Sequence, residues 1–259
     1  METILKKTIK SGNASAVVLP KAWLDKNVRI ELVDRTLEVI LSDVLDIVKS
    51  DINLSEIIGI YLVGSYAREE QTDLSDVDVL VISEGTNKTI KKGDYEIMII
   101  SEDLLNYKLE KNLLPIGTML NEAKPLLNNK FLREIDVKVT RKNVKWYLDT
   151  TKDRLKVIKE SIDRIEKKPD GKLSDVVAYS LVLRLRTLYM IDCLKKNKSY
   201  SKHDLVKLVK DISGSLIAYD RYVYSKGNKC DGRKLPLNEG KKLYEYLKDY
   251  LVRVRKGIG

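Results

Sequence analysis

Asp76 and Asp78 are two carboxylates separated by one residue, within the segment 75–81 of sequence Ser-Asp-Val-Asp-Val-Leu-Val. In a β-strand, residues i and i+2 point to the same face, so these two side chains would lie side by side. Unpaired carboxylates that point together from apolar strand sequence repel each other, and a divalent cation is the usual remedy. An isolated Asp-x-Asp pair is more often a plain pair of acids at a strand end, so the surrounding sequence decides between the two.

That surrounding sequence contains the pair Gly64-Ser65, which ends an apolar run and is separated from Asp76 by ten residues. Gly64 would let a ligand approach the backbone closely, and Ser65 offers a hydroxyl and an amide. Arg68 follows one turn later with a guanidinium fork that suits phosphate oxygens, and Ser75 directly precedes the acids. A triphosphate with a bound cation fits this pattern. We therefore assign nucleotide binding to Gly64, Ser65, Arg68 and Ser75, and metal binding and catalysis to Asp76 and Asp78.

The spacing of apolar residues predicts the elements that position this site. Apolar positions recur at helical spacing over 37–48, and a continuous apolar run over 57–63 ends at the Gly-Ser pair. Segments 77–82 and 95–100 predict two further strands, and Ser101 precedes acidic residues as at the start of a helix. The predicted order is therefore helix, strand, turn with a helix start, strand and strand.

From residue 141 onward the pattern is helical almost throughout, with breaks at 168–171, 197–201 and 227–236. This pattern predicts a helical bundle. One of its helices is strongly apolar yet contains Arg184 and Arg186, which cannot both lie unpaired on an apolar stripe. We expect one of the two to meet a carboxylate or a phosphate.

Composition restricts the kinds of protein and of metal site that the chain can form. With 259 residues, 43% of them hydrophobic, the chain can bury a core, and no stretch of the sequence is apolar enough to span a bilayer. The first residues lack the features of a signal peptide, so we place the protein in the cytoplasm. Cys193 and Cys230 have no Cys-x-x-Cys spacing and His203 is the only histidine, which argues against a zinc site and a His-based triad. Any metal must therefore be held by carboxylates.

Charge is divided unevenly along the chain. Residues 1–140 carry 18 Lys/Arg and 23 Asp/Glu, a net charge of −5, whereas 141–259 carry 30 and 15, a net charge of +15. An acidic part joined to a basic part suggests metal chemistry in the first and contact with a polyanion or nucleotide in the second. A Lys-rich solvated surface is the other interpretation, and the sequence leaves both open.

The segment 61–81 resembles the nucleotidyltransferases of the DNA polymerase β superfamily, which carry Gly-Ser, a spacer near ten residues and then Asp-x-Asp. The resemblance spans roughly 36–130 and is closest to the branch that includes the minimal nucleotidyltransferases and kanamycin nucleotidyltransferase. It implies a mixed sheet with flanking helices, two Mg²⁺ ions (or Mn²⁺), and transfer of a nucleoside monophosphate from a nucleoside triphosphate with release of pyrophosphate. Many relatives have Gly where Glu69 stands, which bears on the shape of the loop.

The family resemblance also implies a third carboxylate on the next strand. Glu96 alternates with apolar neighbours in the predicted strand 95–100 and is favoured, because adjacent strands bring acids together most simply. Asp136 is the alternative. If Glu96 is correct, the metal-binding and catalytic set is Asp76, Asp78 and Glu96.

Residues 1–34 predict a small β unit, with short apolar runs over 4–9, 16–19 and 28–33 broken by Gly12-Asn13 and Pro20. The Gly-Asn turn and the run Leu-Pro-Lys-x-Trp-Leu that contains Pro20 resemble the AbrB-like swapped-hairpin family. That resemblance implies two chains that interleave their strands in one barrel, often with DNA bound. Six Lys/Arg against four Asp/Glu is a weak charge for a DNA-binding arm, so a homodimer is favoured over nucleic-acid binding.

The predicted fold class is α+β, with an AbrB-like β unit (1–34), a mixed-sheet nucleotidyltransferase domain (35–140) and a helical bundle (141–259). With the resemblance, the predicted function is Mg²⁺-dependent transfer of AMP or another nucleoside monophosphate to a hydroxyl of a small molecule or a protein. One alternative is an antitoxin-like transferase that modifies a partner protein. The other is a DNA-binding regulator with an inactive transferase fold, against which the three retained acids argue.

Overall fold

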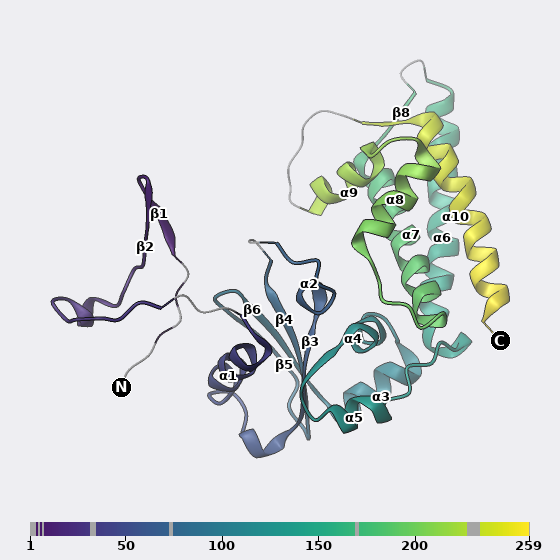
Figure 1. Cartoon of the computed structure of the whole chain (residues 1–259). Helices are drawn as coiled ribbons and strands as arrows, with labels where there is room; N and C mark the ends of the chain where they lie inside the picture. Colours follow the sequence, from purple (N-terminus) through teal and green to yellow (C-terminus); the bar gives the residue numbers. More distant parts are fainter. Residues whose placement is uncertain are drawn as a thin grey trace. The chain divides into compact units, whose positions relative to one another are not determined.

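The computed structural model describes residues 4, 6, 8–31, 35–72, 75–168, 171–226 and 234–258. The chain divides into two compact units, Met1–Thr36 and Leu37–Gly259 (Figure 1). Within the described ranges, no helix combines the length and the apolar character that crossing a membrane requires.

The first unit contains one hairpin, in which β1 (Ile9–Ser11) pairs antiparallel with β2 (Ala14–Ala16). The predicted Gly-Asn turn joins the two strands, and Gly12 supplies the positive φ (+61°) that the turn requires. The 3-10 helix η1 (Lys21–Trp23) follows. The hairpin and its turn thus agree with the sequence pattern.

The other predicted strands of this unit are not formed among its described residues. Residues 17–19 and 28–31 have no strand structure, and 32–34 lie outside the described residues. Large apolar side chains are exposed, including Val18 (62%), Leu24 (72%) and Ile30 (68%). Because so short a segment cannot bury an apolar face by itself, its remaining strands have nothing to pack against in a single chain. The AbrB-like architecture and the dimer stay predictions.

The second unit begins with a five-stranded mixed sheet in the order β5-β6-β4-β3-β7. The β4 and β6 strands are parallel, and the other neighbours are antiparallel. In chain order the strands are β3 (Ile57–Val63), β4 (Val77–Ser83), β5 (Lys88–Lys92), β6 (Tyr95–Ser101) and β7 (Lys124–Leu127). The three predicted strands are confirmed as β3, β4 and β6, and with them the predicted α+β class.

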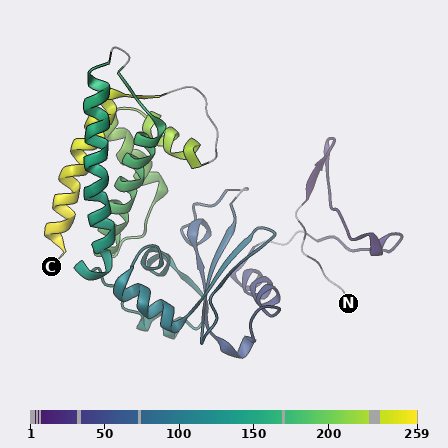
Figure 2. The same ribbon diagram turned by 180° about the vertical axis from the view of Figure 1, so that it is seen from behind.

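Successive side chains along β4 point alternately to the two faces of the sheet. Val79 and Val81 pack with residues of α1 (Leu37–Val48), the helix predicted over 37–48. Leu80 and Ile82 pack on the opposite face with residues of α3 (Glu102–Lys111) and α4 (Ile116–Glu122). Figures 1 and 2 show the sheet between α1 on one side and α3 and α4 on the other.

Short elements connect these layers. The 3-10 helix η2 (Leu54–Glu56) precedes β3, the one-turn helix α2 (Gly64–Ala67) follows it, and α5 (Asn129–Glu134) follows β7. The helix predicted to start after Ser101 is confirmed as α3, because the Ser101 hydroxyl accepts a hydrogen bond from the Leu104 amide.

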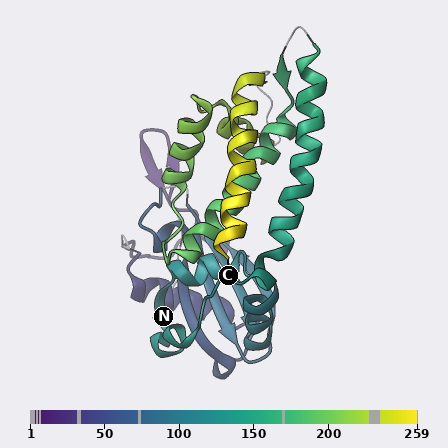
Figure 3. The same cartoon turned by 90° about the vertical axis from the view of Figure 1, so that its right-hand side faces the viewer.

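The helical part of the second unit contains five helices among its described residues and will be called the helical region. They are α6 (Arg141–Glu166), α7 (Asp175–Lys195), α8 (Lys202–Ser213), α9 (Ile217–Lys226) and α10 (Leu237–Gly257), with a small sheet of β8 (Lys172–Leu173) and β9 (Leu235–Pro236). A capping box formed by Thr140 and Asn143 fixes the start of α6. Figure 3 shows the long helices α6 and α10 running along each other.

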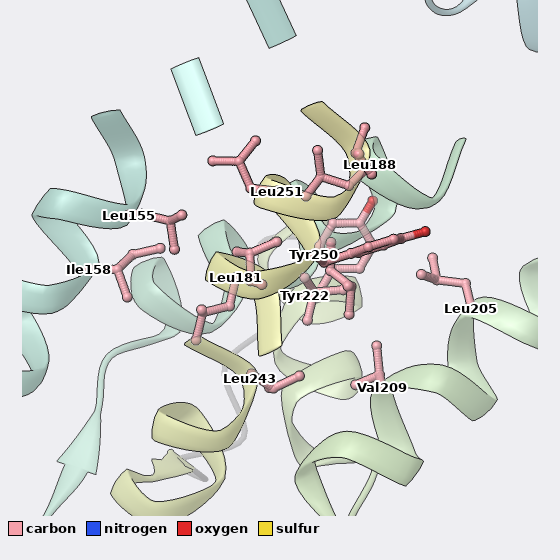
Figure 4. Close-up of a cluster of buried hydrophobic side chains, with 14 of the residues drawn as sticks. Leu155, Ile158, Leu181, Leu188, Leu205, Val209, Tyr222, Leu243, Tyr250 and Leu251 are labelled. Atoms are coloured by element: carbon pink, nitrogen blue, oxygen red, sulfur yellow. The ribbon is translucent and has the colours of Figure 1, made fainter. Parts of the chain in front are cut away.

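Leucine, isoleucine and valine side chains from several helices form the core of this region. Figure 4 shows Ile158 of α6, Leu181 of α7, Val209 of α8 and Leu251 of α10 converging around Tyr222 of α9. The predicted helix breaks at 168–171 and 197–201 agree with the ends of α6 and α7, and most of the break at 227–236 lies outside the described residues. The helical region therefore has its own apolar core.

Candidate active site

The three predicted acids lie on one face of the sheet. Asp78 alternates in step with Leu80 along β4, and Glu96 with Ile100 along β6, so both point toward the face that α3 and α4 cover. The parallel register pairs Asp78 directly with Glu96. Asp76 comes two residues before Asp78 and directly precedes the first residue of β4. Neighbouring strands thus bring together the acids that are far apart in the sequence.

The pKa of Asp78 reflects the negative charges near it. Burial, the negative charge of Glu96 and that of Asp76 raise the pKa of Asp78 from 3.8 to about 6, although Arg68 opposes the shift. The native fold therefore concentrates negative charge around Asp78, and the neighbouring cations offset it only in part. Such a site attracts cations.

Carboxylate oxygens are the ligands that Mg²⁺ and Mn²⁺ prefer, so the donor set around Asp78 fits a hard divalent cation. The acids do not form a closed metal site, and no group of three His, Cys, Asp or Glu side chains in the described part of the chain is arranged to hold an ion. Instead, the Glu96 carboxylate pairs with Lys91 Nζ of β5 at 2.8 Å. Asp136, the alternative third acid, is exposed in the segment after α5 and does not contribute to the shift of Asp78.

Gly64 lies directly against Asp78, because Val63 pairs with Asp78 in the antiparallel register of β3 and β4. Gly64 has a φ of +71°, and a Cβ at this position would stand 2.1 Å from Asp78 Oδ2. Any other residue would therefore strain the backbone and collide with the carboxylate. The structure places the predicted Gly-Ser turn beside the predicted acids, as the spacing of the two motifs indicated.

Ser65 and Ser75 differ in how their hydroxyls are used. The half-buried Ser65 side chain forms no hydrogen bond with the described residues, so its hydroxyl is available to a ligand. The Ser75 hydroxyl accepts a hydrogen bond from the Thr72 amide at 2.9 Å and lies 3.2 Å from the Thr72 hydroxyl. The Ser75 side chain is therefore tied to Thr72, and its role in nucleotide binding stays a prediction.

Arg68 is held by two acids. Its Nε lies 2.9 Å from Glu70 Oε2, and its Nη1 lies 2.7 Å from Glu122 Oε2. Glu122, at the end of α4, also accepts a hydrogen bond from the Gly64 amide at 2.8 Å. Its side chain is only 6% exposed, and burial raises the pKa of Glu122 against the opposing effect of Arg68. Glu122 thus ties Arg68 to the turn that holds Gly64.

Sequence reasoning missed Glu122. Its partners are 54 and 58 residues away, so no local spacing indicates the contact. The only available signal is an acid at the end of a helix whose other residues include the buried Ile116 and Leu120, with no cation one turn earlier to pair with it.

The two arginines of α7 meet no carboxylate among the described residues, whereas the phosphate alternative stays a prediction. Arg184 Nη1 donates a hydrogen bond to the Thr150 hydroxyl at 3.1 Å, and Arg186 Nη1 lies 3.3 Å from the Tyr222 hydroxyl. Arg186 also lies over the ring of Tyr200, 5.4 Å from its centroid. Hydroxyls and a ring face, rather than a carboxylate, are the partners of these arginines among the described residues, because neutral groups can accept guanidinium donors without introducing a second buried charge.

Residues 41–165 match the family model of the nucleotidyltransferase domain, a segment that contains the Gly-Ser turn, all three acids and Glu122. The chain therefore carries a nucleotidyltransferase domain and is an enzyme of that class. No curated protein matches the sequence.

Solved structures that match the chain include a nucleotidyltransferase-like protein from Exiguobacterium sibiricum, at 15% identity and a TM-score of 0.39, covering 83% of this chain and 75% of that one. Another is spectinomycin adenyltransferase AAD(9) from Enterococcus faecialis with ATP and spectinomycin, at 16% identity and a TM-score of 0.42, covering 82% of this chain and 98% of that one. These similarities are too low to indicate a substrate.

Proposed function

We propose that the protein transfers a nucleoside monophosphate, AMP in the first instance, from a nucleoside triphosphate to a hydroxyl acceptor and releases pyrophosphate. The observation that carries this proposal is the cluster of Asp78, Glu96 and Asp76, whose charges raise the pKa of Asp78 directly beside the Gly64 turn of a nucleotidyltransferase domain. These three carboxylates would hold Mg²⁺ or Mn²⁺. A bound divalent cation would neutralise charge that develops on the phosphate oxygens during transfer.

The residues of the chain would then divide the remaining work. The Ser65 hydroxyl binds the triphosphate. Gly64 has no side chain and therefore leaves room for a phosphate beside Asp78. Arg68 contributes positive charge beside the site, held in place by Glu70 and Glu122. Residues 35–140 contain the groups that bind the metal and the triphosphate, and residues 141–259 form the surface that binds the acceptor.

The acceptor is a small molecule or a protein that presents a hydroxyl. A protein acceptor corresponds to an antitoxin-like role, and a small molecule to a modifying enzyme. DNA binding by the N-terminal unit is not the main function, because a regulator with an inactive domain has no need of a half-buried Asp78 whose pKa burial, Glu96 and Asp76 raise.

The test uses triphosphates labelled at one position. Wild-type protein is incubated with each of the four nucleoside triphosphates carrying ³²P at the α-phosphate, with Mg²⁺ and with candidate hydroxyl acceptors that include the protein itself and partner proteins. A parallel set carries the label at the γ-phosphate. Nucleotidyl transfer labels the acceptor only from the α position. Labelling from the γ position instead would mean phosphoryl transfer and would overturn the proposal.

A further inference from the structure

The loop 197–201, which joins α7 to α8 in the helical region, contacts the turn that follows β3. The ring of Tyr200 lies between two guanidinium groups, with Arg68 Cζ 5.6 Å and Arg186 Cζ 5.4 Å from its centroid. Arg68 belongs to the turn beside Asp78, whereas Arg186 belongs to α7. One aromatic ring thus joins a cation of the active-site turn to a cation of the helical region.

Two further contacts join the same loop to the nucleotidyltransferase domain. Ser201 and Lys202 lie near the Glu70 carboxylate and help Arg68 to lower the pKa of Glu70 against the effect of burial. Asn121, beside Glu122 on α4, donates a hydrogen bond from its Nδ2 to the Lys198 carbonyl at 2.8 Å. Contacts from both ends of the loop therefore converge on the turn and on the helix that holds it.

The helical core fixes the position of Tyr200. Its ring packs edge-on against Tyr189 of α7, with centroids 5.9 Å apart, and lies under the guanidinium of Arg186. Arg186 bonds in turn to the hydroxyl of Tyr222, which is buried in the cluster of Figure 4 and stacks on Tyr179 at 5.3 Å. The ring that contacts Arg68 is thus packed against the core of the helical region.

A second series of contacts connects Arg68 to Asp78, the proposed metal ligand. Its guanidinium pairs with Glu122, whose second oxygen accepts from the Gly64 amide, and Gly64 lies against Asp78. An unbroken series of contacts therefore runs from the core of the helical region to the proposed metal ligand.

We propose that Tyr200 is a positioning residue, through which the helical region holds Arg68 and the turn 64–67 in place against Asp78. This proposal rests on the proposed function for its catalytic consequence but not for its structural one. The helical region then does more than offer a surface to the acceptor, since Tyr200 adds a contact that holds Arg68 to those made by Glu70 and Glu122.

Amide hydrogen exchange measures the structural consequence without any substrate. In Tyr200→Ala the guanidinium loses its ring, and exchange of the amides in 64–70 should rise about tenfold. Tyr200→Phe keeps the ring and should exchange like the wild type. Tyr246→Ala is the matched control, because Tyr246 also contacts an arginine, Arg253 of its own helix α10, and lies outside the loop. It should leave 64–70 unchanged.

Transfer kinetics on the same variants measure the catalytic consequence. Tyr200→Ala should lower kcat about tenfold or more, whereas Tyr200→Phe and Tyr246→Ala should stay within about twofold of the wild type. Unchanged exchange of 64–70 in Tyr200→Ala, or equal loss in Tyr246→Ala, would overturn the positioning role while leaving the proposed function intact. A wild-type protein that transfers no label overturns the proposed function, and the exchange comparison still decides whether Tyr200 holds the turn.

Discussion

Replacing Asp78 by asparagine should abolish transfer and at the same time stabilise the metal-free fold. The substitution keeps the shape of the side chain and removes a negative charge that the native structure holds next to Glu96 and Asp76. Loss of one group that stabilises charge in the transition state typically costs about 10²–10³ in rate, and loss of a bound metal costs more. Activity and stability should therefore change in opposite directions.

The magnitude follows from the pKa of Asp78, which the fold raises from 3.8 to about 6. Each pKa unit corresponds to ~1.4 kcal/mol, so the ionised side chain costs the native state at most about 3 kcal/mol at neutral pH. Because Asp78 is partly exposed, screening by solvent reduces this to roughly 1–2 kcal/mol. The native state binds the proton more tightly than the unfolded state, so the cost is absent below pH 3.8, grows toward pH 6 and is complete above it.

Urea unfolding in EDTA at pH 7 and pH 4 measures this directly. The Asp78→Asn variant should exceed the wild type by about 1–2 kcal/mol in free energy of unfolding at pH 7, and most of that difference should vanish at pH 4. The control is Asp46→Asn, because hydrogen bonding to Lys49 lowers the pKa of Asp46 and its amide should give no gain. A less stable Asp78→Asn variant at pH 7, or a gain that is equal at both pH values, would refute the reasoning.

Glu69 has a φ of +60°, where glycine is unstrained and other residues lose about 1 kcal/mol, so Glu69→Gly should exceed Glu69→Ala in unfolding free energy by roughly that amount. Both variants lose the exposed ion pair with Lys124, and an alanine variant as stable as the glycine one would contradict this account. Removing Lys91 frees Glu96 from its ion pair, so Lys91→Ala should bind Mg²⁺ up to about fivefold more tightly by calorimetry, and weaker binding would count against Glu96 as a ligand. Deleting residues 1–34 should reduce the particle mass in light scattering from dimer to monomer, and an unchanged mass would show that this unit does not mediate association.

Much of the sheet could be predicted because its central strands are mostly apolar. The runs over 57–63, 77–82 and 95–100 correspond to β3, β4 and β6, the strands that carry the turn and the acids. The edge strand β5 was not predicted, since Lys-Thr-Ile-Lys-Lys is exposed almost throughout and has no apolar face for its spacing to indicate. β7 was missed as well, because it is four residues long and includes a proline.

The site itself was predictable only where its residues lie close in the sequence or on adjacent strands. Gly64 and Asp78 follow from local spacing, and Glu96 from the alternation of one strand. Glu122 and Tyr200 reach the turn from elements far along the chain, and no single sequence shows which distant side chains meet. Neither arginine of α7 meets a carboxylate among the described residues, because threonine and tyrosine hydroxyls are their partners there, and a phosphate partner stays a prediction.

The most direct test of the central claim is a titration of label transfer with divalent metal. Wild-type protein stripped with EDTA should transfer no α-phosphate label, added Mg²⁺ or Mn²⁺ should restore transfer, and Asp76→Asn and Asp78→Asn should stay inactive at every metal concentration. Circular dichroism would confirm that both variants are folded. Full transfer in EDTA, or near wild-type transfer by both folded variants, would contradict the claim that these carboxylates hold the metal on which the reaction depends.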